Sequence, residues 1–183
     1  MNIFVLDFHP RIAAQYHCDQ HVIKMILESA QMLCTAAHAH GIDAPYRPTH
    51  AKHPCTLWLM QSRANWNWLV ALAYGLNEEY MVRFCHTRPH KSWVVIEQLV
   101  CPESLPDICL TQFAQAMPDQ YKVPGDPVAA YRAFYNGDKA RFASWRPERR
   151  VAALVPAVAL VRLHPVQFGC ARGREFPQGG RSH

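Results

Sequence analysis

The chain has 183 residues, of which 50 % are hydrophobic and 18 % are charged, and its formal net charge is +5. A chain of this length can bury one core, and its 8 Phe, 5 Trp and 7 Tyr exclude an intrinsically disordered protein. The most apolar run, residues 151–161, contains Pro156 and is shorter than the roughly 20 residues that a transmembrane helix needs. We therefore expect a globular protein with no membrane span.

The first residues carry no basic leader of the kind that opens a secretory signal, and Asp7 interrupts their apolar run. The 7 cysteines include no C-x-x-C pair. Together these features predict a cytoplasmic protein whose cysteines are reduced thiols, most of them in the core. The positive charge is concentrated in the C-terminal half, which is compatible with a polyanionic partner such as nucleic acid.

Two long helices are predicted in the first half of the chain. Apolar residues recur at helical spacing over residues 11–38, with no Gly or Pro, and Gly41 and Pro45 then end the helix. Residues 40–54 hold several prolines and are predicted to form a loop. A second long helix is predicted over residues 56–84, and Pro89 breaks the chain after it.

Shorter elements are predicted to follow. Residues 91–100 form a helix or a strand, and residues 101–127 form a linker punctuated by prolines. Asp126 and Pro127 are typical of a helix N-cap and first turn, so a short helix runs from there to Tyr135 and ends at the Asn-Gly pair 136–137. A last short helix is predicted over residues 139–145.

The predicted fold is therefore all-α. Residues 1–150 form a single compact helical domain built on two long helices plus shorter C-terminal helices. Residues 151–183 change character, to an Ala/Val-rich and then a Gly/Arg-rich segment, and form a C-terminal extension to which no structure or role is assigned.

Four ionisable residues share one narrow face of the first predicted helix. At 100° per residue, His17, His21, Lys24 and Glu28 lie within one arc, and Gln31 extends it. Two imidazoles, an ammonium and a carboxylate in line make an acid/base surface. The alternative is an ordinary solvated helix face with an i, i+4 pair. Histidine is uncommon on such faces, and the chain start could fold back over this one.

A metal site is a second interpretation of the same residues. His17 and His21 have the i, i+4 spacing that lets two imidazoles share one ion, and His50 or His53 could complete the set. The spacing matches no zinc signature, and Asp19 lies on the opposite side of the helix. The expectation from sequence is no metal and no cofactor.

Aromatic and basic side chains alternate over residues 131–139. This pattern is typical of nucleic-acid-binding segments, in which cations bind phosphates and aromatic rings stack on bases. A packed terminal helix with a solvated basic edge would give the same pattern.

With these pieces in order, residues 1–140 resemble the pyrimidine-dimer DNA glycosylases of the phage endonuclease V type and their short bacterial relatives. The D-Q-H sequence at 19–21, followed by Glu28, is similar to that family's D-Q-H and catalytic glutamate. Residues 131–139 resemble its aromatic and basic C-terminal segment. The residues that resemble the family's second helix are His53, Pro54, Trp58, Leu69, Tyr74, Glu79 and Arg83.

The resemblance implies an all-α enzyme that flips a nucleotide out of damaged double-stranded DNA and excises a base. In that family the chain-terminal α-amine attacks C1′ of the sugar, and the glutamate assists the ring opening and β-elimination. Because Asn2 follows the initiator, the reactive amine here would belong to Met1. An α-amine has a pKa of about 7.7–8.0 in peptides, so it is partly neutral and nucleophilic at cellular pH.

The resemblance, together with the polar face of the first helix, predicts that Glu28, Met1 and His21 are catalytic residues. The expected protein is a monomer bound to double-stranded DNA. The predicted substrate contacts are His17, Lys24, Gln31, His53, Arg83, Tyr131, Arg132, Tyr135 and Lys139.

Two other functions stay open at this point. A metal-dependent hydrolase or nucleotide-modifying enzyme would use the clustered histidines. A non-catalytic DNA-binding module would need only the basic C-terminal half.

Overall fold

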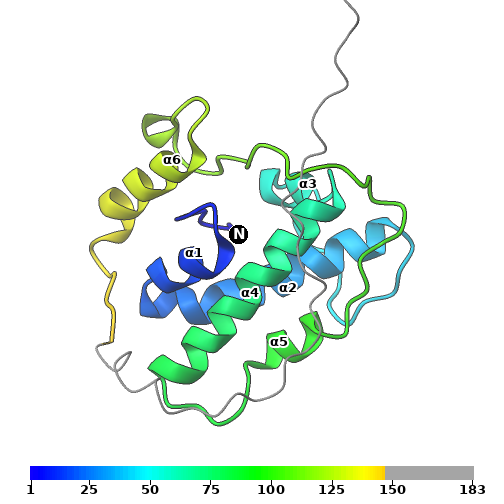
Figure 1. Ribbon diagram of the computed structural model, residues 1–183, viewed down its shortest axis with the longest axis horizontal. Coiled ribbons are helices and arrows are strands. Elements are labelled where there is room, and N and C mark those ends of the chain that lie inside the picture. Colours follow the sequence, from blue (N-terminus) through cyan, green and yellow to red (C-terminus); the bar gives the residue numbers. More distant parts are fainter. Residues whose placement is uncertain (147–183) are drawn as a thin grey trace, which may run out of the picture.

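The structure is a computed structural model that describes residues 1–146, and every regular element in that range is helical (Figure 1). The predicted all-α class is confirmed. No helix in this range combines the length and apolarity needed to cross a bilayer. The predicted extension over residues 151–183 lies outside the described residues. The elements are α1 (Pro10–Tyr16), α2 (Asp19–Ala39), α3 (Pro54–Leu59), α4 (Arg63–Arg83), α5 (Lys91–Ile96), the 3₁₀ turn η1 (Asp119–Tyr121), α6 (Pro127–Phe134) and the π-helical turn η2 (Tyr135–Lys139).

The two longest helices form the centre of the fold. Helices α2 and α4 pack against each other, α1 packs on α4, and α3 and α5 both pack on α2 (Figure 1). The apolar stripe of α2, which includes Val22, Met25 and Leu33, is fully buried against them. At Gly75 the contact between α1 and α4 is so close that an added Cβ would lie 2.9 Å from the Cβ of Ala14.

The helix predicted over residues 11–38 is two helices, with a break at His17 and Cys18. Both residues have extended backbone angles. The break has a physical cause in Arg83, whose guanidinium donates hydrogen bonds to the carbonyl oxygens of Gln15 at 2.8 Å and His17 at 2.6 Å. A continuous helix would use those carbonyl groups internally, so the guanidinium replaces the missing turn.

The second long helix, predicted over residues 56–84, is also divided. Ser62 is the N-cap of α4, and its Oγ accepts a hydrogen bond from the N–H of Asn65 at 3.1 Å. The Asn65 side chain donates to the carbonyl oxygen of Trp58 at 2.6 Å, which satisfies the end of α3. Two polar residues therefore convert one predicted helix into a helical corner.

In the C-terminal part, the structure confirms one predicted feature and differs from the prediction at two others. Asp126 caps α6 as predicted, accepting from the N–H of Ala129 at 2.9 Å. The Asn-Gly pair at 136–137 does not end the helix, because the chain continues into η2. The helix predicted over residues 139–145 is absent. The carbonyl of Ser144 instead accepts the N–H of Asp19 at 2.9 Å, which keeps this segment alongside the start of α2.

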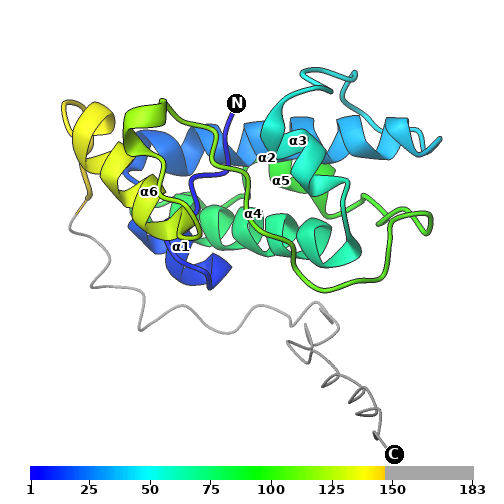
Figure 2. The same cartoon turned by 90° about the horizontal axis from the view of Figure 1, so that it is seen from above.

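The N-terminal segment lies across α2. Ile3, Val5 and Leu6 are buried, and Phe4 adopts a positive φ of 37°. The side-chain oxygen of Asn2 accepts the N–H of Ile3 at 2.8 Å and that of Phe4 at 3.3 Å, which holds this turn. The N-terminus is central in Figure 1 and at an edge in Figure 2, so it lies in the middle of one face of the molecule.

Candidate functional site

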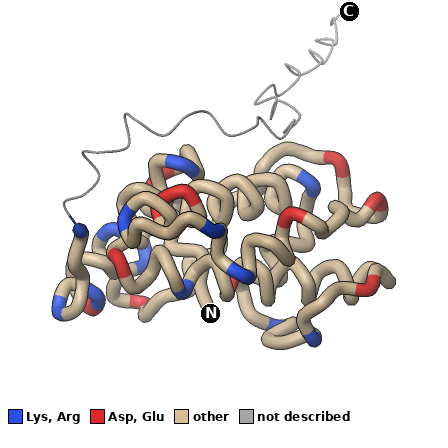
Figure 3. Tube along the Cα trace, turned by 90° about the horizontal axis from the view of Figure 1, so that it is seen from below, with Lys and Arg blue, Asp and Glu red and all other residues tan. Residues whose placement is uncertain are grey.

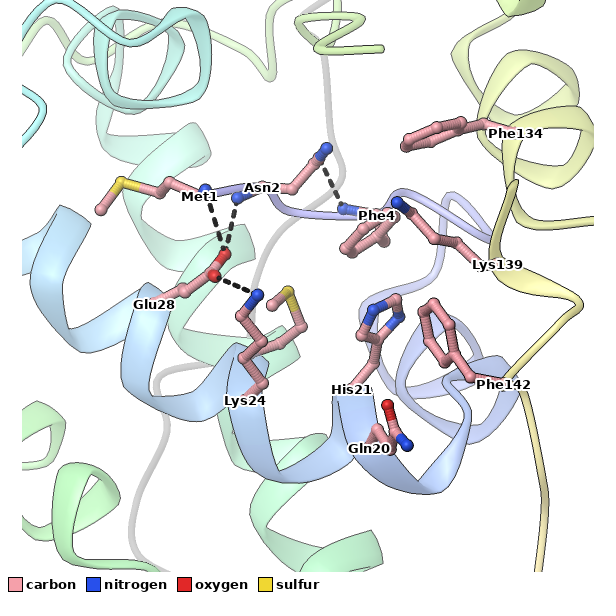
Figure 4. Close-up of a pocket in the computed structure, with 11 residues that line it drawn as sticks. Met1, Asn2, Phe4, Gln20, His21, Lys24, Glu28, Phe134, Lys139 and Phe142 are labelled. Carbon is pink, nitrogen blue, oxygen red and sulfur yellow. Dashed lines mark hydrogen bonds and ion pairs between the residues drawn. The ribbon is translucent and has the colours of Figure 1, made fainter. Parts of the chain in front are cut away.

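The carboxylate of Glu28 is the point at which the chain start meets the middle of α2 (Figure 4). Its Oε2 accepts the N–H of Asn2 at 2.8 Å and lies 3.7 Å from the α-nitrogen of Met1. The other oxygen, Oε1, lies 3.5 Å from Nζ of Lys24. Glu28 is only 7 % exposed, so the hydrogen bond and the two cations offset the cost of burying its charge.

A pocket of about 410 Å³ opens beside this contact. Its walls come from the N-terminal segment, the first half of α2, the end of α6 with η2, and the segment after η2 (Figure 4). The lining residues are Met1, Asn2, Phe4, Gln20, His21, Lys24, Met25, Glu28, Phe134, Lys139 and Phe142.

The pocket is positively charged on balance. Glu28 is the one acidic residue among those that line it, against the ammonium groups of Met1, Lys24 and Lys139. Lys139 is placed by η2, with its Nζ 4.5 Å from the centre of the Phe134 ring. Lys and Arg positions lie on both sides of the N-terminus in Figure 3. An anionic ligand with an apolar, planar part would match this lining.

His21 is held between aromatic rings at the inner wall. Its ring stacks on Phe4 at 4.5 Å between centroids and meets Phe142 edge-on at 5.5 Å. Burial, with smaller effects from the charges of Lys139 and Lys24, lowers the pKa of His21 from 6.5 to about 4. The imidazole is therefore neutral near pH 7.

His53, a predicted contact residue, does not line the pocket. Its Nδ1 accepts the N–H of Cys55 at 3.2 Å and so caps α3. The pKa of His53 is lowered first by burial and then by the nearby Met1 ammonium. Burial also raises the pKa of Cys55 to about 12, so this thiol is not a nucleophile near pH 7.

The structure thus brings together five of the predicted site residues, namely Met1, His21, Lys24, Glu28 and Lys139. Gln31 lies one turn beyond Glu28, is half-buried, and does not line the pocket.

Arg83 is not at the pocket, although the resemblance makes it a substrate contact. It is 2 % exposed and forms ion pairs with Glu79 at 2.7 Å and Asp19 at 3.2 Å. Together with its bonds to the α1 carbonyl groups, these pairs occupy the guanidinium within the protein.

His17 also lies away from the pocket, because the break after α1 removes it from the helix that carries His21. It is fully buried, its Nδ1 donates to the carbonyl of Ala13 at 2.7 Å, and its Nε2 has no partner. Burial, the largest cause, lowers its pKa to about 3. The prediction that His17 shares a face with His21 was wrong because it assumed an unbroken helix.

In the aromatic and basic segment 131–139, some side chains lie in the core and others at the surface. Tyr131 is buried and donates to the carbonyl of Ala114 at 2.8 Å. Arg132 donates to the carbonyl of Leu6 at 2.8 Å and pairs with Asp7 at 3.3 Å. Tyr135 lies buried behind His21. Tyr131 and Tyr135 therefore fit the packed-helix alternative for this segment, whereas Lys139 reaches the pocket.

The histidine set of the metal hypothesis is not assembled. Residues 1–146 contain no group of three or more His, Cys, Asp or Glu side chains placed to hold an ion. The rings of His17 and His21 lie 6.5 Å apart, and Nδ1 of His50 bonds to Oγ1 of Thr49 at 2.7 Å.

Several pocket residues were not identified from sequence. Asn2, Phe4 and Phe142 carry no motif, and only the fold places them together. Phe134 lies within the aromatic and basic segment 131–139, which was the signal available for it. Gln20 stands within the D-Q-H sequence, which was the signal available for it.

No family model, curated protein or solved structure matches this chain. The pocket therefore carries the chemistry from which a function can be inferred. A primary amine beside a buried carboxylate can form a covalent bond to an electrophilic carbon while the carboxylate stabilises the positive charge that develops.

The two buried histidines make stability depend on pH. Their pKa values are depressed in the folded protein, so the stabilisation is present above pH 6.5 and is lost as pH falls toward 4 for His21 and 3 for His17. When the pH falls from 7 to 5, each of the two histidines should lower the free energy of unfolding by up to about 2 kcal/mol. Urea denaturation at the two pH values measures the loss.

His21→Gln should reduce the pH-dependent part of this loss by about half, apart from smaller effects in the same direction from His53 and His90. His9→Gln, at an exposed position, provides the matched comparison for the same substitution in the core. Equal stability of the wild type at pH 7 and pH 5 would contradict this account.

Proposed function

We propose that this protein is a DNA glycosylase with an associated lyase step, which excises a damaged or modified base from double-stranded DNA. The observation that carries the proposal is the 3.7 Å separation between the Met1 α-nitrogen and Glu28 Oε2 beside a cationic, aromatic pocket. The sequence resemblance supports the same residues in the same roles.

The reaction would begin at the Met1 amine. After the ammonium loses a proton, its lone pair attacks C1′ of the target nucleotide, the N–C1′ bond forms, and the base leaves with the electrons of the glycosidic bond. Glu28 and His53 are the nearby groups that could accept the proton. The departing base takes a proton from the nitrogen now bonded to C1′. The nitrogen lone pair then breaks the C1′–O4′ bond, O4′ takes the proton released from the ammonium at the start, and a protonated imine forms beside the regenerated Glu28 carboxylate. Loss of a C2′ proton expels the 3′ phosphate by β-elimination.

Glu28 would act through its charge. Its carboxylate lies 3.7 Å from the amine, so a carbon attacked by that amine would be close enough for the carboxylate to stabilise the cationic sugar and the protonated imine. The bond from the Asn2 N–H keeps Oε2 aimed at the chain start before substrate binds. Such prior positioning means that little rearrangement is needed during the reaction.

The remaining pocket walls match a nucleotide. Lys24 and Lys139 are cations that can bind phosphate oxygens, and the rings of Phe134 and Phe142 can stack on a base. A nucleotide can reach such a pocket only when it is extruded from the duplex, which costs least where pairing is already damaged.

Borohydride trapping on a duplex with one aldehydic abasic site tests the imine without knowledge of the lesion. Wild-type protein should give a covalent adduct. Glu28→Gln should lower the trapping rate by about 100-fold or more, since the neutral amide cannot stabilise the cation. Glu78→Gln, on the exposed face of α4, is the matched control and should trap at the wild-type rate.

Two results would reject this chemistry: no adduct with the wild type, or an undiminished adduct with Glu28→Gln. Salt-dependent DNA binding without any adduct would instead favour the non-catalytic binding module.

The pocket lysines should contribute to DNA affinity. Lys24→Met and Lys139→Met should each weaken binding to a short duplex and reduce the slope of log affinity against log salt by about 1. Lys91→Met, on α5 and outside the pocket, should leave the slope unchanged. Fluorescence anisotropy over a salt series provides the measurement, and an unchanged slope in both pocket variants would contradict the assigned phosphate contacts.

A further inference from the structure

Tyr135 lies directly behind the pocket wall and touches the ring of His21. It is the first residue of η2 and only 5 % exposed. Its hydroxyl oxygen is 2.5 Å from Nδ1 of His21, 3.1 Å from the backbone nitrogen of Cys18, and 3.5 Å from Sγ of Cys18. All three contacts are buried, so this hydroxyl has a fixed set of partners.

The donors and acceptors in this cluster can be assigned. The Cys18 N–H can only donate, so the phenol oxygen accepts from it. The phenol proton then has two possible acceptors, a thiol sulfur at 3.5 Å and an imidazole nitrogen at 2.5 Å. Sulfur is a weak acceptor, and the shorter contact is to the stronger base. Of these two acceptors, Nδ1 of His21 is the better placed for the Tyr135 O–H.

The hydrogen bond at Nδ1 determines whether the other ring nitrogen, Nε2, carries a hydrogen. A neutral ring whose Nδ1 accepts a hydrogen bond must carry its own hydrogen on Nε2. His21 lines the pocket, and the charged groups around it are the ammonium groups of Lys24 and Lys139, which disfavour an imidazolium. His21 thus presents a neutral N–H donor to a ligand.

We propose that Tyr135 is a positioning residue that holds His21 as its Nε2–H tautomer, and that this N–H recognises a carbonyl oxygen of the base in the pocket. The ligand assignment deepens the proposed function and rests on it. The oxygens of Glu28 are already engaged, so the inner wall offers mostly donors and selects a ligand edge that accepts.

The surroundings of His21 favour a base over a phosphate as its partner. The imidazole is neutral and stands between the rings of Phe4 and Phe142, so it meets a ligand in an aromatic part of the pocket that suits a planar base (Figure 4). A phosphate would be bound better by the Lys24 and Lys139 ammonium groups at the same pocket.

His17 provides an internal reference for the tautomer. Its Nδ1 lies 2.7 Å from a carbonyl oxygen, which can only accept, so its hydrogen must be on Nδ1. The two neighbouring buried histidines are therefore expected to be opposite tautomers.

The tautomers can be measured by long-range ¹H–¹⁵N correlation spectra of histidine-labelled full-length protein at pH 7. We expect the Nε2–H pattern for His21 and the Nδ1–H pattern for His17, with signals assigned through His21→Gln. Tyr135→Phe should convert His21 to a mixture of tautomers and leave the His17 pattern unchanged. Tyr121→Phe, which removes another phenol hydroxyl from the same part of the fold, should change neither.

The Nδ1–H form of His21 in the wild type, or an unchanged His21 pattern in Tyr135→Phe, would overturn the positioning role. This readout needs no substrate, so it is independent of whether the protein excises bases.

The ligand is tested in the same spectra with thymidine 5′-monophosphate and with 2-deoxyribose 5-phosphate. A shift of the His21 Nε2 signal with the nucleotide alone supports recognition of a base carbonyl. An equal shift with the sugar phosphate assigns the acceptor to phosphate or sugar oxygens and overturns the base assignment. No shift with either probe at millimolar concentration also overturns it. Failure of the proposed function would appear separately, as the absence of any trapped adduct.

Discussion

The candidate site depends on the hydrogen bond from the Asn2 N–H to the carboxylate of Glu28. A carboxylate that is 7 % exposed must be paired, and here its partners are the backbone and α-amine of the chain start together with Lys24. Electrostatics therefore hold the N-terminal segment across α2. The buried side chains of Ile3, Val5 and Leu6 add apolar burial to that attachment.

A second buried ionic group, the guanidinium of Arg83, fixes the path of the chain between α1 and α2. Arg83 binds the carbonyl end of α1 and the Asp19 carboxylate at the start of α2, and so fixes the corner between these helices. Helix α1 packs on α4, and the face of α2 with His21, Lys24 and Glu28 borders the pocket with the N-terminal segment. Removal of one partner from such a network leaves an unpaired buried charge, so the corner should be sensitive to substitution.

Local patterns in the sequence predicted part of this arrangement. Helical periodicity identified the all-α class and the shared face of His21, Lys24 and Glu28, and the Asp-Pro pair at 126–127 identified the α6 cap. Periodicity could not reveal the break at His17, because the cause is a side chain 66 residues away in sequence. The pocket walls from Phe134 and Phe142 depend on long-range packing in the same way. The resemblance placed Met1 with Glu28, a pair that no spacing rule would connect.

In the proposed reaction, the Met1 amine, and not a lysine, is the nucleophile beside Glu28. Reduction of the trapped DNA complex, followed by proteolysis and mass spectrometry of the modified peptide, identifies the nitrogen that carries the sugar. The account predicts the adduct on the α-nitrogen of Met1. An adduct on the ε-nitrogen of Lys24 or Lys139 would contradict it.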